Sequence, residues 1–301
     1  MIEGQENVTW DDWCAIAAAC EEHGIGTLFR SDHYISQGDE FHSVAHDAWT
    51  VIAALATRTT TLRFGTLVSP ATFRAPGLLA NAVATADHVS GGRVELGLGA
   101  GWMEREHRAF GFDFPETSVR VERFAEQLEI VHRLWTEERV DFRGRHYTLE
   151  DAPGLPKPVQ KPRPPIIVGG SGKRGTIEPA LRFADEYNTP FVSPAEAAEI
   201  REKTRPLRFS VMTGFLVGET DAEMRERARR LYDARRREQS FDDWLGAYSE
   251  RCVVGSVEEV VARLREYEAA GCDRVMLQHL LHTDLEPVRL LGEVLSPALA
   301  S

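Results

Sequence analysis

The most reactive combination of side chains in this chain is an aspartate next to a histidine, Asp32 and His33, within the run Ser31-Asp32-His33-Tyr34. The run follows an apolar stretch at 27–30 that reads as a buried strand. At the exit of such a strand, the aspartate could accept hydrogen bonds and the histidine could transfer a proton near neutral pH. An ordinary polar loop is the alternative. A Ser31 nucleophile activated by His33 is also conceivable, but the chain has no G-x-S-x-G elbow.

A second candidate site is a glycine-rich loop that suits a phosphate group. The apolar run 165–169 leads into this loop, which passes directly into a helix. Its candidate binding residues are Gly169, Gly170, Ser171, Lys173 and Arg174. Glycines expose backbone N–H groups, and the start of a helix adds its dipole to the two cations. The spacing is not that of a Walker loop, and a flexible turn with incidental basic residues is the alternative.

A third glycine-rich segment, Gly97 to Trp102, only superficially matches a dinucleotide fingerprint. After Gly97 and Gly99 the third glycine would belong at position 102, where this chain has tryptophan, and no acidic strand end follows about twenty residues later. The segment therefore argues against a nicotinamide site of the Rossmann type.

Two further groups of residues carry weaker signals. His42 and His46 lie one helical turn apart, with carboxylates at 39, 40 and 47, but surface histidines near a helix start explain them better than a metal site does. Gln278 and His279 follow the last apolar run and could line a substrate pocket, although a structural role explains them equally well. We therefore expect no metal.

The elements that must position these residues follow an α/β pattern, in which short apolar runs alternate with segments of helical period. The predicted strands are 27–30, 62–68, 93–98, 165–169, 185–188, 208–217 and 273–278. They are mostly apolar rather than alternating, as parallel strands covered on both faces are. Capping boxes predict helix starts at Ser193, Thr220 and Ser256, and a first helix is expected over 9–23.

Two irregularities interrupt the repeat. Only residues 1–3 precede the first helix, so the first strand is expected to be very short, or clipped because the sequence begins inside the natural reading frame. Residues 136–165 read as a hairpin turning at Arg143-Gly144 and a proline-rich stretch, inserted after the fourth strand-helix unit. The charged helix from Thr220 through Arg237 is expected to present a solvated face. We predict a single domain over 1–301.

The composition and net charge of the chain limit the kinds of partner that it can bind. With 301 residues, 43% hydrophobic, the chain can bury a sizeable core, and its net charge of −12 disfavours nucleic acid. The four cysteines form no C-x-x-C pair, and neither a secretory peptide nor a membrane span is visible. We therefore expect a cytoplasmic protein that acts on a small molecule.

Taken together, these segments resemble the luciferase-like monooxygenase family of flavin- and deazaflavin-dependent oxidoreductases, over nearly the whole chain. The resemblance rests on S-D-H-Y at 31–34, F-G-T-L-V-S-P-A-T-F-R-A-P at 64–76, D-H-V-S-G-G-R-V-E-L-G-L-G-A-G-W at 87–102, P-P-I-I-V-G-G-S-G at 164–172 and F-A-D-E-Y-N at 183–188. The branch that the chain most resembles uses coenzyme F420, a 5-deazaflavin hydride carrier, rather than riboflavin phosphate (FMN).

The resemblance implies a (β/α)8 TIM barrel with the cofactor across its C-terminal mouth, commonly a homodimer, with reduced cofactor supplied by a separate flavin or F420 reductase. Carried over by position, Asp32 and His33 would lie near the ring system, with His33 transferring the proton. The peptide joining Leu67 and Val68 would be a non-proline cis bond supporting the ring. The remaining cofactor contacts would come from Gly99, Ala100, Gly101, Gly169, Gly170, Ser171, Lys173 and Arg174.

One departure bears on the reaction. Family members that oxidise sugar phosphates have a carboxylate where this chain has Trp102, so the resemblance favours an apolar or aromatic substrate, with Glu104 or Glu106 as replacement acids. Arg105 stands where several relatives have an asparagine that touches the cofactor. We expect hydride transfer between F420 and a small organic substrate. The alternatives are an FMN-dependent monooxygenase using reduced flavin and O2, and a flavin-binding protein without turnover.

Overall fold

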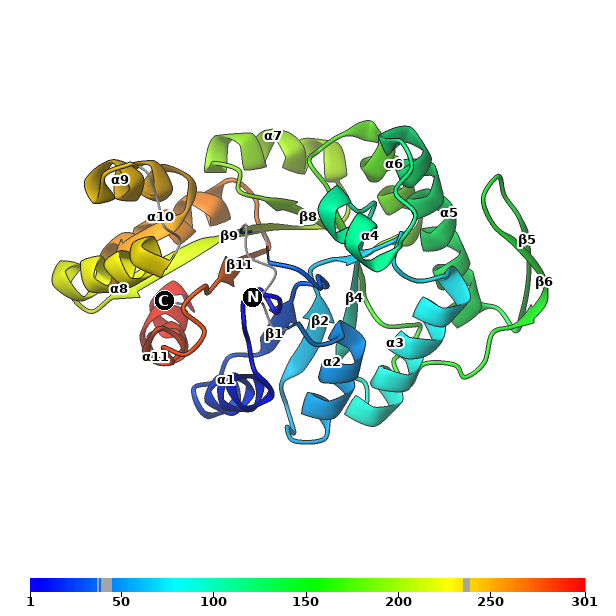
Figure 1. The fold of residues 1–301 in the computed structure, drawn as a ribbon, viewed down its shortest axis with the longest axis horizontal. Coiled ribbons are helices and arrows are strands. Elements are labelled where there is room, and N and C mark those ends of the chain that lie inside the picture. The colour runs from blue at the N-terminus through cyan, green and yellow to red at the C-terminus, as the bar shows by residue number, and fades with distance from the viewer. Residues whose placement is uncertain (37, 39–44, 235–238, 301) are drawn as a thin grey trace.

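The computed structural model describes residues 1–36, 38, 45–234 and 239–300, and in it helices surround a sheet of parallel strands (Figure 1). The sheet has nine strands in the order β1-β2-β4-β7-β8-β9-β10, with β3 paired to β4 and β11 paired to β9. The bounds are β1 Thr27–Arg30, β2 Arg63–Thr66, β3 Ser69–Pro70, β4 Val94–Gly99, β7 Ile166–Gly169, β8 Glu186–Pro190, β9 Arg208–Gly218, β10 Val253–Ser256 and β11 Arg274–Gln278.

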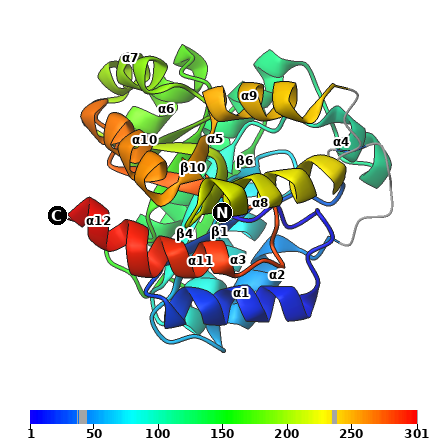
Figure 2. The same ribbon diagram turned by 90° about the vertical axis from the view of Figure 1, so that its left-hand side faces the viewer.

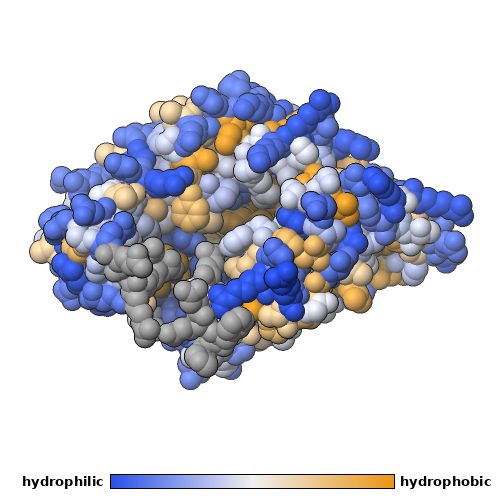
Figure 3. Space-filling view, turned by 45° about the horizontal axis from the view of Figure 1, so that its top comes forward, coloured by the Kyte–Doolittle hydropathy of each residue, from blue (hydrophilic) through white to orange (hydrophobic). Residues whose placement is uncertain are grey.

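Helices follow most strands and form the outer layer. Their bounds are α1 Trp10–Glu22, α2 Ala48–Ala56, α3 Pro76–Ser90, α4 Glu104–Phe110, α5 Thr117–Thr136, α6 Arg174–Phe183, α7 Pro194–Thr204, α8 Asp221–Ala234, α9 Phe241–Arg251, α10 Val257–Ala269, α11 Glu286–Leu290, the π-helical turn η1 Leu291–Leu295 and α12 Ser296–Ala300. Figures 1 and 2 both place α1 beside α11. The face drawn in Figure 3 is largely hydrophilic, with hydrophobic patches near its middle. Among the described helices, none is long and apolar enough to cross a membrane.

Residues 1–3 close the barrel between β1 and β11, and they confirm the prediction of a very short first strand. Ile2 forms a single parallel bridge with Arg30, its N–H donating to the carbonyl of Phe29 at 2.9 Å. On the other side, the Met1 ammonium donates to the carbonyl of Leu277 at 2.8 Å. Strand-like hydrogen bonds on both edges therefore complete the ring of strands.

Two strand predictions need correction. The run 62–68 is not one strand, because β2 ends at Thr66 and the chain pairs again only at β3, beyond the Leu67–Val68 peptide. Strand β10 was missed, because its four residues contain only two apolar side chains and pass directly into the capping box of Ser256. It pairs with the second half of β9, whose first half pairs with β11.

The long strand β9 therefore extends beyond the barrel and supports a second, smaller core. The side chains of this core, which we call the α8–α9 cluster, come from β9, α8 and α9. They are Leu216, Met224, Ala228, Leu231, Phe241, Trp244 and Leu245. The cluster is separate from the main hydrophobic core of the barrel.

The predicted helix caps are present. Ser193 and Ser256 each form a reciprocal capping box with the glutamate three residues on, and Thr9 does the same with Asp12 at the start of α1. Thr220 accepts from the N–H of Glu223 at 3.3 Å. Most arginines of α8 are exposed as predicted, but Arg227 is buried and donates to Asp284 at 3.1 Å.

The predicted insertion is an antiparallel hairpin, β5 Arg139–Arg143 and β6 Thr148–Pro153, set apart from the barrel beside α5 (Figure 1, right). Its turn is closed by a hydrogen bond from the N–H of Gly144 to the carbonyl of Tyr147 at 2.9 Å. The carboxylate of Glu126 on α5 accepts from the backbone N–H groups of the turn, which fixes the hairpin to the helix.

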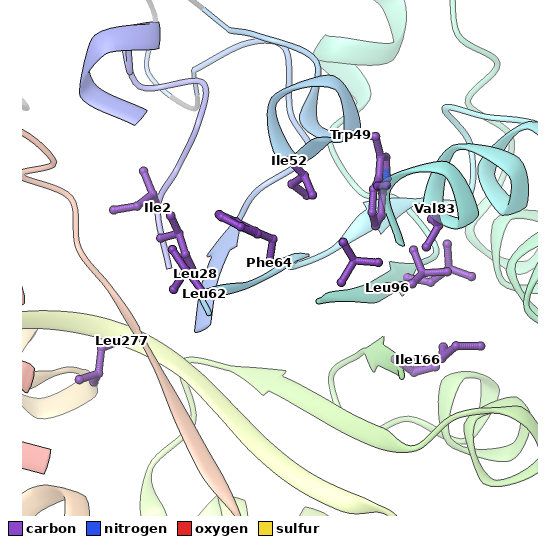
Figure 4. Close-up of a cluster of buried hydrophobic side chains, with 14 of the residues drawn as sticks. Ile2, Leu28, Trp49, Ile52, Leu62, Phe64, Val83, Leu96, Ile166 and Leu277 are labelled. Carbon is purple, nitrogen blue, oxygen red and sulfur yellow. The ribbon is translucent and has the colours of Figure 1, made fainter. Parts of the chain in front are cut away.

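The main core lies between the strands and the outer helices, where side chains of α2 and α3, among them Trp49 and Val83, lie beside those of the strands, among them Phe64 and Leu96 (Figure 4). The barrel interior also holds charged groups. Arg274 of β11 donates to Glu95 at 2.7 Å and forms an ion pair with Glu186 at 2.8 Å. The guanidinium of Arg274 therefore neutralises two buried carboxylates inside the barrel.

We expect Gly97→Ala to lower the free energy of unfolding by about 1–3 kcal/mol or more, because a Cβ there would lie 2.0 Å from the carbonyl oxygen of Thr66. Gly246→Ala in α9 is the matched control, since a Cβ at that position meets nothing within 4 Å. The control should gain about 0.5–1 kcal/mol, as alanine does over glycine inside a helix. Urea unfolding measures both changes, and a Gly97→Ala protein as stable as wild type would contradict the packing argument.

Candidate active site

Asp32 lies just beyond β1, and its carboxylate is only 1% exposed. It accepts hydrogen bonds from the hydroxyl of Ser69 at 2.6 Å and from the guanidinium of Arg74 at 2.6 Å. Arg74 also binds Asp47 at 2.5 Å. The carboxylate of Asp32 therefore ties the end of β1 to the segment that follows β2. These are positioning contacts, and its catalytic and cofactor-binding roles stay predictions.

His33, the next residue, is paired with a buried carboxylate. Its Nδ1 lies 2.8 Å from Oε2 of Glu106, which is 0% exposed. Burial lowers the pKa of His33, but the hydrogen bond and charge of Glu106, with the charges of Glu3 and Asp32, outweigh burial and raise the pKa above its ordinary value. The pair is therefore suited to holding and releasing a proton close to neutral pH.

Glu106 stands in the first turn of α4, which lies at the end of the segment following β4. Besides His33, it accepts hydrogen bonds from the backbone N–H of Tyr34 and from that of Ile35 at 3.2 Å. The sequence offered Glu104 and Glu106 as equal candidates for an acid near position 102. The structure brings Glu106 to His33, whereas Glu104 is exposed and pairs with Arg108 at 3.3 Å.

Trp102 contacts the other member of the pair. Its ring meets that of His33 edge to face with centroids 5.7 Å apart, and the residue is 60% exposed. Aromatic side chains also pack α4 against the neighbouring segments. The ring of Phe73 has its centroid 5.5 Å from that of Tyr34 and 5.1 Å from that of His107 on α4. A large, exposed aromatic surface therefore lies directly beside the titratable histidine.

Glycine and apolar residues form a floor at the C-terminal ends of the strands, the end at which Asp32 and His33 also lie. The Leu67–Val68 peptide is cis, as the family resemblance implied. A Cβ at Gly99 would lie 2.7 Å from a methyl of Val68, and one at Gly169 would lie 2.8 Å from the other methyl. The structure therefore brings together Leu67, Val68, Gly99 and Gly169, and only glycine on β4 and β7 leaves room for the valine.

Ala100 and Gly101 continue this edge. Gly101 has a φ of +82°, a left-handed conformation that favours glycine, and its carbonyl accepts from Arg120 at 3.2 Å. Ala100 is partly buried against the main core. Their predicted role at the border of a cofactor pocket stays a prediction.

The glycine-rich loop after β7 is braced from behind by Tyr187. Its hydroxyl accepts from the N–H of Gly172 at 3.0 Å and lies 2.8 Å from the hydroxyl of Thr176. A Cβ at Gly170 would lie 2.3 Å from this hydroxyl, and the N–H of Gly170 is already bonded to the carbonyl of Asn188 at 3.0 Å. Gly170 is therefore required for packing, and its N–H is not available to a ligand.

The outer part of the same loop is open. Ser171, Lys173 and Arg174 are exposed, and α6 begins at Arg174 without a side-chain cap. Arg174 pairs with Glu178 at 2.5 Å along the helix. The uncapped N–H groups and the cationic side chains favour an anion at this position.

The two residues predicted to line a substrate pocket are engaged elsewhere. Gln278 donates to the buried carboxylate of Glu3 at 2.5 Å. His279 bonds to the carbonyl of Asp284 at 2.7 Å, and burial lowers its pKa to about 4. His279 also lines a mostly apolar cavity of about 190 Å³ between α1, α11 and strands β1 and β11. Their place in a substrate pocket stays a prediction.

Of the weak metal candidate, His42 and its acidic neighbours 39 and 40 lie outside the described residues. Within the described ranges, no three histidine, cysteine or carboxylate side chains come together as metal ligands would.

Comparison with known proteins places this fold and site in a family. The sequence model of the luciferase-like monooxygenases matches residues 2–274. The chain belongs to the luciferase-like monooxygenase family. The family resemblance and the TIM-barrel prediction are thereby confirmed.

The curated relatives of this luciferase-like protein include F420-dependent glucose-6-phosphate dehydrogenases. The one from Nakamurella multipartita is 36% identical over 176 residues, which are 58% of this chain and 50% of the relative. The one from Amycolatopsis mediterranei is 35% identical over 208 residues, 64% of this chain and 61% of the relative. The matched part therefore spans about half to three fifths of the length of these relatives.

Solved structures share the whole fold at lower identity. Monooxygenase RslO1 from Streptomyces bottropensis superposes with a TM-score of 0.81 at 23% identity, over 96% of this chain and 93% of that one. An F420-dependent secondary alcohol dehydrogenase, in complex with an F420-acetone adduct, has a TM-score of 0.80 at 20% identity, over 99% and 97% of the two chains. At this identity the likeness establishes the luciferase-like barrel.

We expect Asp32→Asn to lower the free energy of unfolding by about 3–5 kcal/mol, because the partly buried guanidinium of Arg74 loses its most buried counter-charge. Asp47→Asn, which removes a half-exposed partner of the same arginine, is the matched control and should cost about 1 kcal/mol or less. Guanidinium chloride unfolding compares the two. Equal losses would show that Asp32 is not the anchor of this segment.

Proposed function

We propose that this luciferase-like protein transfers a hydride between coenzyme F420 and a small organic substrate at the C-terminal end of its barrel. The observation that carries the proposal is the buried His33–Glu106 pair, 2.8 Å between Nδ1 and Oε2, placed by the two segments that follow β1 and β4. In parallel barrels the reacting groups come from these strand ends. The names of the F420-dependent relatives support the choice of cofactor.

The residues present fit a flat, phosphate-bearing cofactor. Side chains of Phe29, Leu67, Ile167 and Met276 form a buried apolar cluster inside the barrel, with Val68 packed against it. Glycine backbones at 99 and 169 border Val68 closely. We propose that Leu67 and Val68 support one face of the deazaflavin ring, because an apolar floor without projecting side chains accepts a planar ring.

We propose that Ser171, Lys173 and Arg174 hold the cofactor's phosphate, together with the start of α6. The loop is held from below by Tyr187, so its open N–H groups are fixed before a ligand arrives. Fixed donors lose little entropy on binding, which favours affinity.

Bound F420 would supply a hydride donor or acceptor, and the chain's own residues do the rest. The floor and the glycine loop orient the cofactor, while Trp102 covers one side of the substrate space and excludes water there. His33 moves the accompanying proton to or from the substrate at Nε2, since its Nδ1 is occupied by Glu106. Against the opposing effect of burial, the hydrogen bond and charge of Glu106 raise the pKa of His33, so the ring holds its proton more firmly than a free histidine does.

We propose an apolar or aromatic substrate rather than a sugar phosphate. Trp102, 60% exposed beside His33, offers a large apolar surface where a sugar would need hydrogen-bond partners. This separates the chain from the relatives named for glucose 6-phosphate.

For the assembly, we propose a homodimer that receives reduced cofactor from a separate reductase. We also propose a reducing, cytoplasmic setting, which the four free cysteines support.

Separate titrations with F420 and FMN test the cofactor assignment. We expect F420 fluorescence to be quenched at lower concentration than FMN, and Lys173→Ala to weaken F420 binding by about threefold to tenfold, as for one exposed contact to a phosphate. Arg182→Ala removes an exposed cation from the last turn of the same helix and should leave affinity unchanged. Tight FMN binding without F420 quenching would instead favour the monooxygenase alternative.

His33→Gln should lower turnover by about a hundredfold to ten-thousandfold, the usual worth of a positioned proton-transfer group, while cofactor affinity stays within about threefold. Oxidation of reduced F420 across a panel of carbonyl and enone compounds measures the first quantity, and fluorescence titration the second. A cofactor that binds wild type but is never consumed by any compound would support the binding protein without turnover.

A further inference from the structure

We propose that Glu106 is a positioning residue that fixes the tautomer of His33, with the proton on Nδ1, so that Nε2 is the ring atom that exchanges a proton with the substrate. This inference rests on the proposed function only in assigning the exchange to a substrate. The tautomer itself is a property of the chain without any ligand.

The contacts of Glu106 require this arrangement. Its Oε1 accepts from the backbone N–H of Tyr34 and of Ile35, and its Oε2 lies 2.8 Å from Nδ1 of His33. An ionised carboxylate only accepts hydrogen bonds, so Nδ1 must be the donor in the remaining contact. Neutral imidazole has one N–H, and placing it on Nδ1 leaves a lone pair on Nε2.

Glu106 cannot reach a substrate itself, because it is 0% exposed. It holds the ring from one side, while Trp102 meets the same ring edge-on at 5.7 Å. Both the rotation of the imidazole and the position of its proton are therefore set by residues of the segment between β4 and α4 and of α4 itself.

Three carboxylates from three elements act on His33: Glu106 from α4, Glu3 from the segment that closes the barrel, and Asp32 from the end of β1. Arg74 balances the charge of Asp32 at 2.6 Å, and the hydrogen bond with Glu106 acts on the ring directly. Burial opposes protonation, yet the pKa of His33 is raised, so the imidazolium persists to higher pH than in a free histidine.

The substitution Glu106→Gln tests the proposal because it reverses the hydrogen bond. The amide oxygen can still accept from Tyr34 and Ile35, but its NH2 then faces Nδ1, which must accept. In ¹⁵N-labelled, cofactor-free protein, we expect neutral wild-type His33 to carry its proton on Nδ1 and the variant's to carry it on Nε2. The titration midpoint of His33 should fall by about one pH unit or more. The His33→Gln spectrum identifies the signals.

The matched control is Glu293→Gln, which removes the carboxylate of a second His–Glu pair, His23 Nδ1 to Glu293 Oε1 at 2.9 Å, at the surface. It should leave the tautomer and midpoint of His33 unchanged. Far-UV circular dichroism checks that each variant folds, and the wild-type tautomer alone decides the matter if Glu106→Gln does not fold.

Neutral wild-type His33 with its proton on Nε2, or a folded Glu106→Gln protein with an unchanged tautomer and midpoint, would overturn the proposal and leave Glu106 a purely structural residue. Failure of the proposed function looks different, because F420 titration would then show no binding while the tautomer result stands. Where activity is present, Glu106→Gln should shift the histidine-dependent limb of the kcat/KM profile to lower pH.

Discussion

The shape of the barrel mouth depends on the close packing of the Val68 side chain, just after β2, against the glycine backbones of β4 and β7. The side chain of Val68 occupies space that a Cβ on Gly97, Gly99 or Gly169 would fill. Close packing of this kind leaves no slack, since protein interiors have the density of organic crystals. The floor, the turn into β3 and the start of the glycine loop are all placed by this contact, and both candidate binding regions are fixed relative to one another through it.

The neighbouring residues Asp32 and His33 each take part in a pair that contains a buried carboxylate, and the two pairs have different roles. Asp32 is neutralised by Arg74 and anchors the chain, so its charge is balanced within the protein. Glu106 is bound instead by two backbone N–H groups and by the imidazole of His33, which gains and loses its charge with pH. A buried charge is stable only when paired, so the proton on His33 is tied to the stability of the segment as well as to chemistry.

Much of this arrangement could be predicted from the sequence. Strand β7, with the sequence Ile-Ile-Val-Gly, was found because its residues are apolar and most of them are buried, and helix starts were found because capping is local. The resemblance of whole segments supplied the family and the cis peptide at Leu67.

Contacts between residues far apart in the sequence could not be predicted in this way. Glu106 lies 73 residues from His33 and Arg74 lies 42 residues from Asp32. Strand β10 was missed because four residues with two apolar side chains give no periodic signal, and its pairing with the second half of β9 is not visible in the sequence.

The extension of β9 past the barrel has a consequence for how the molecule comes apart. The α8–α9 cluster has its own set of buried side chains, distinct from the main core, and it adjoins the main core at β9 and β10, whose Val217 and Val253 belong to the main core. Regions with separate apolar cores form separate cooperative units in native-state hydrogen exchange. We therefore expect the amides of α8 and α9 to exchange through a sub-global opening that leaves the strands of the barrel paired.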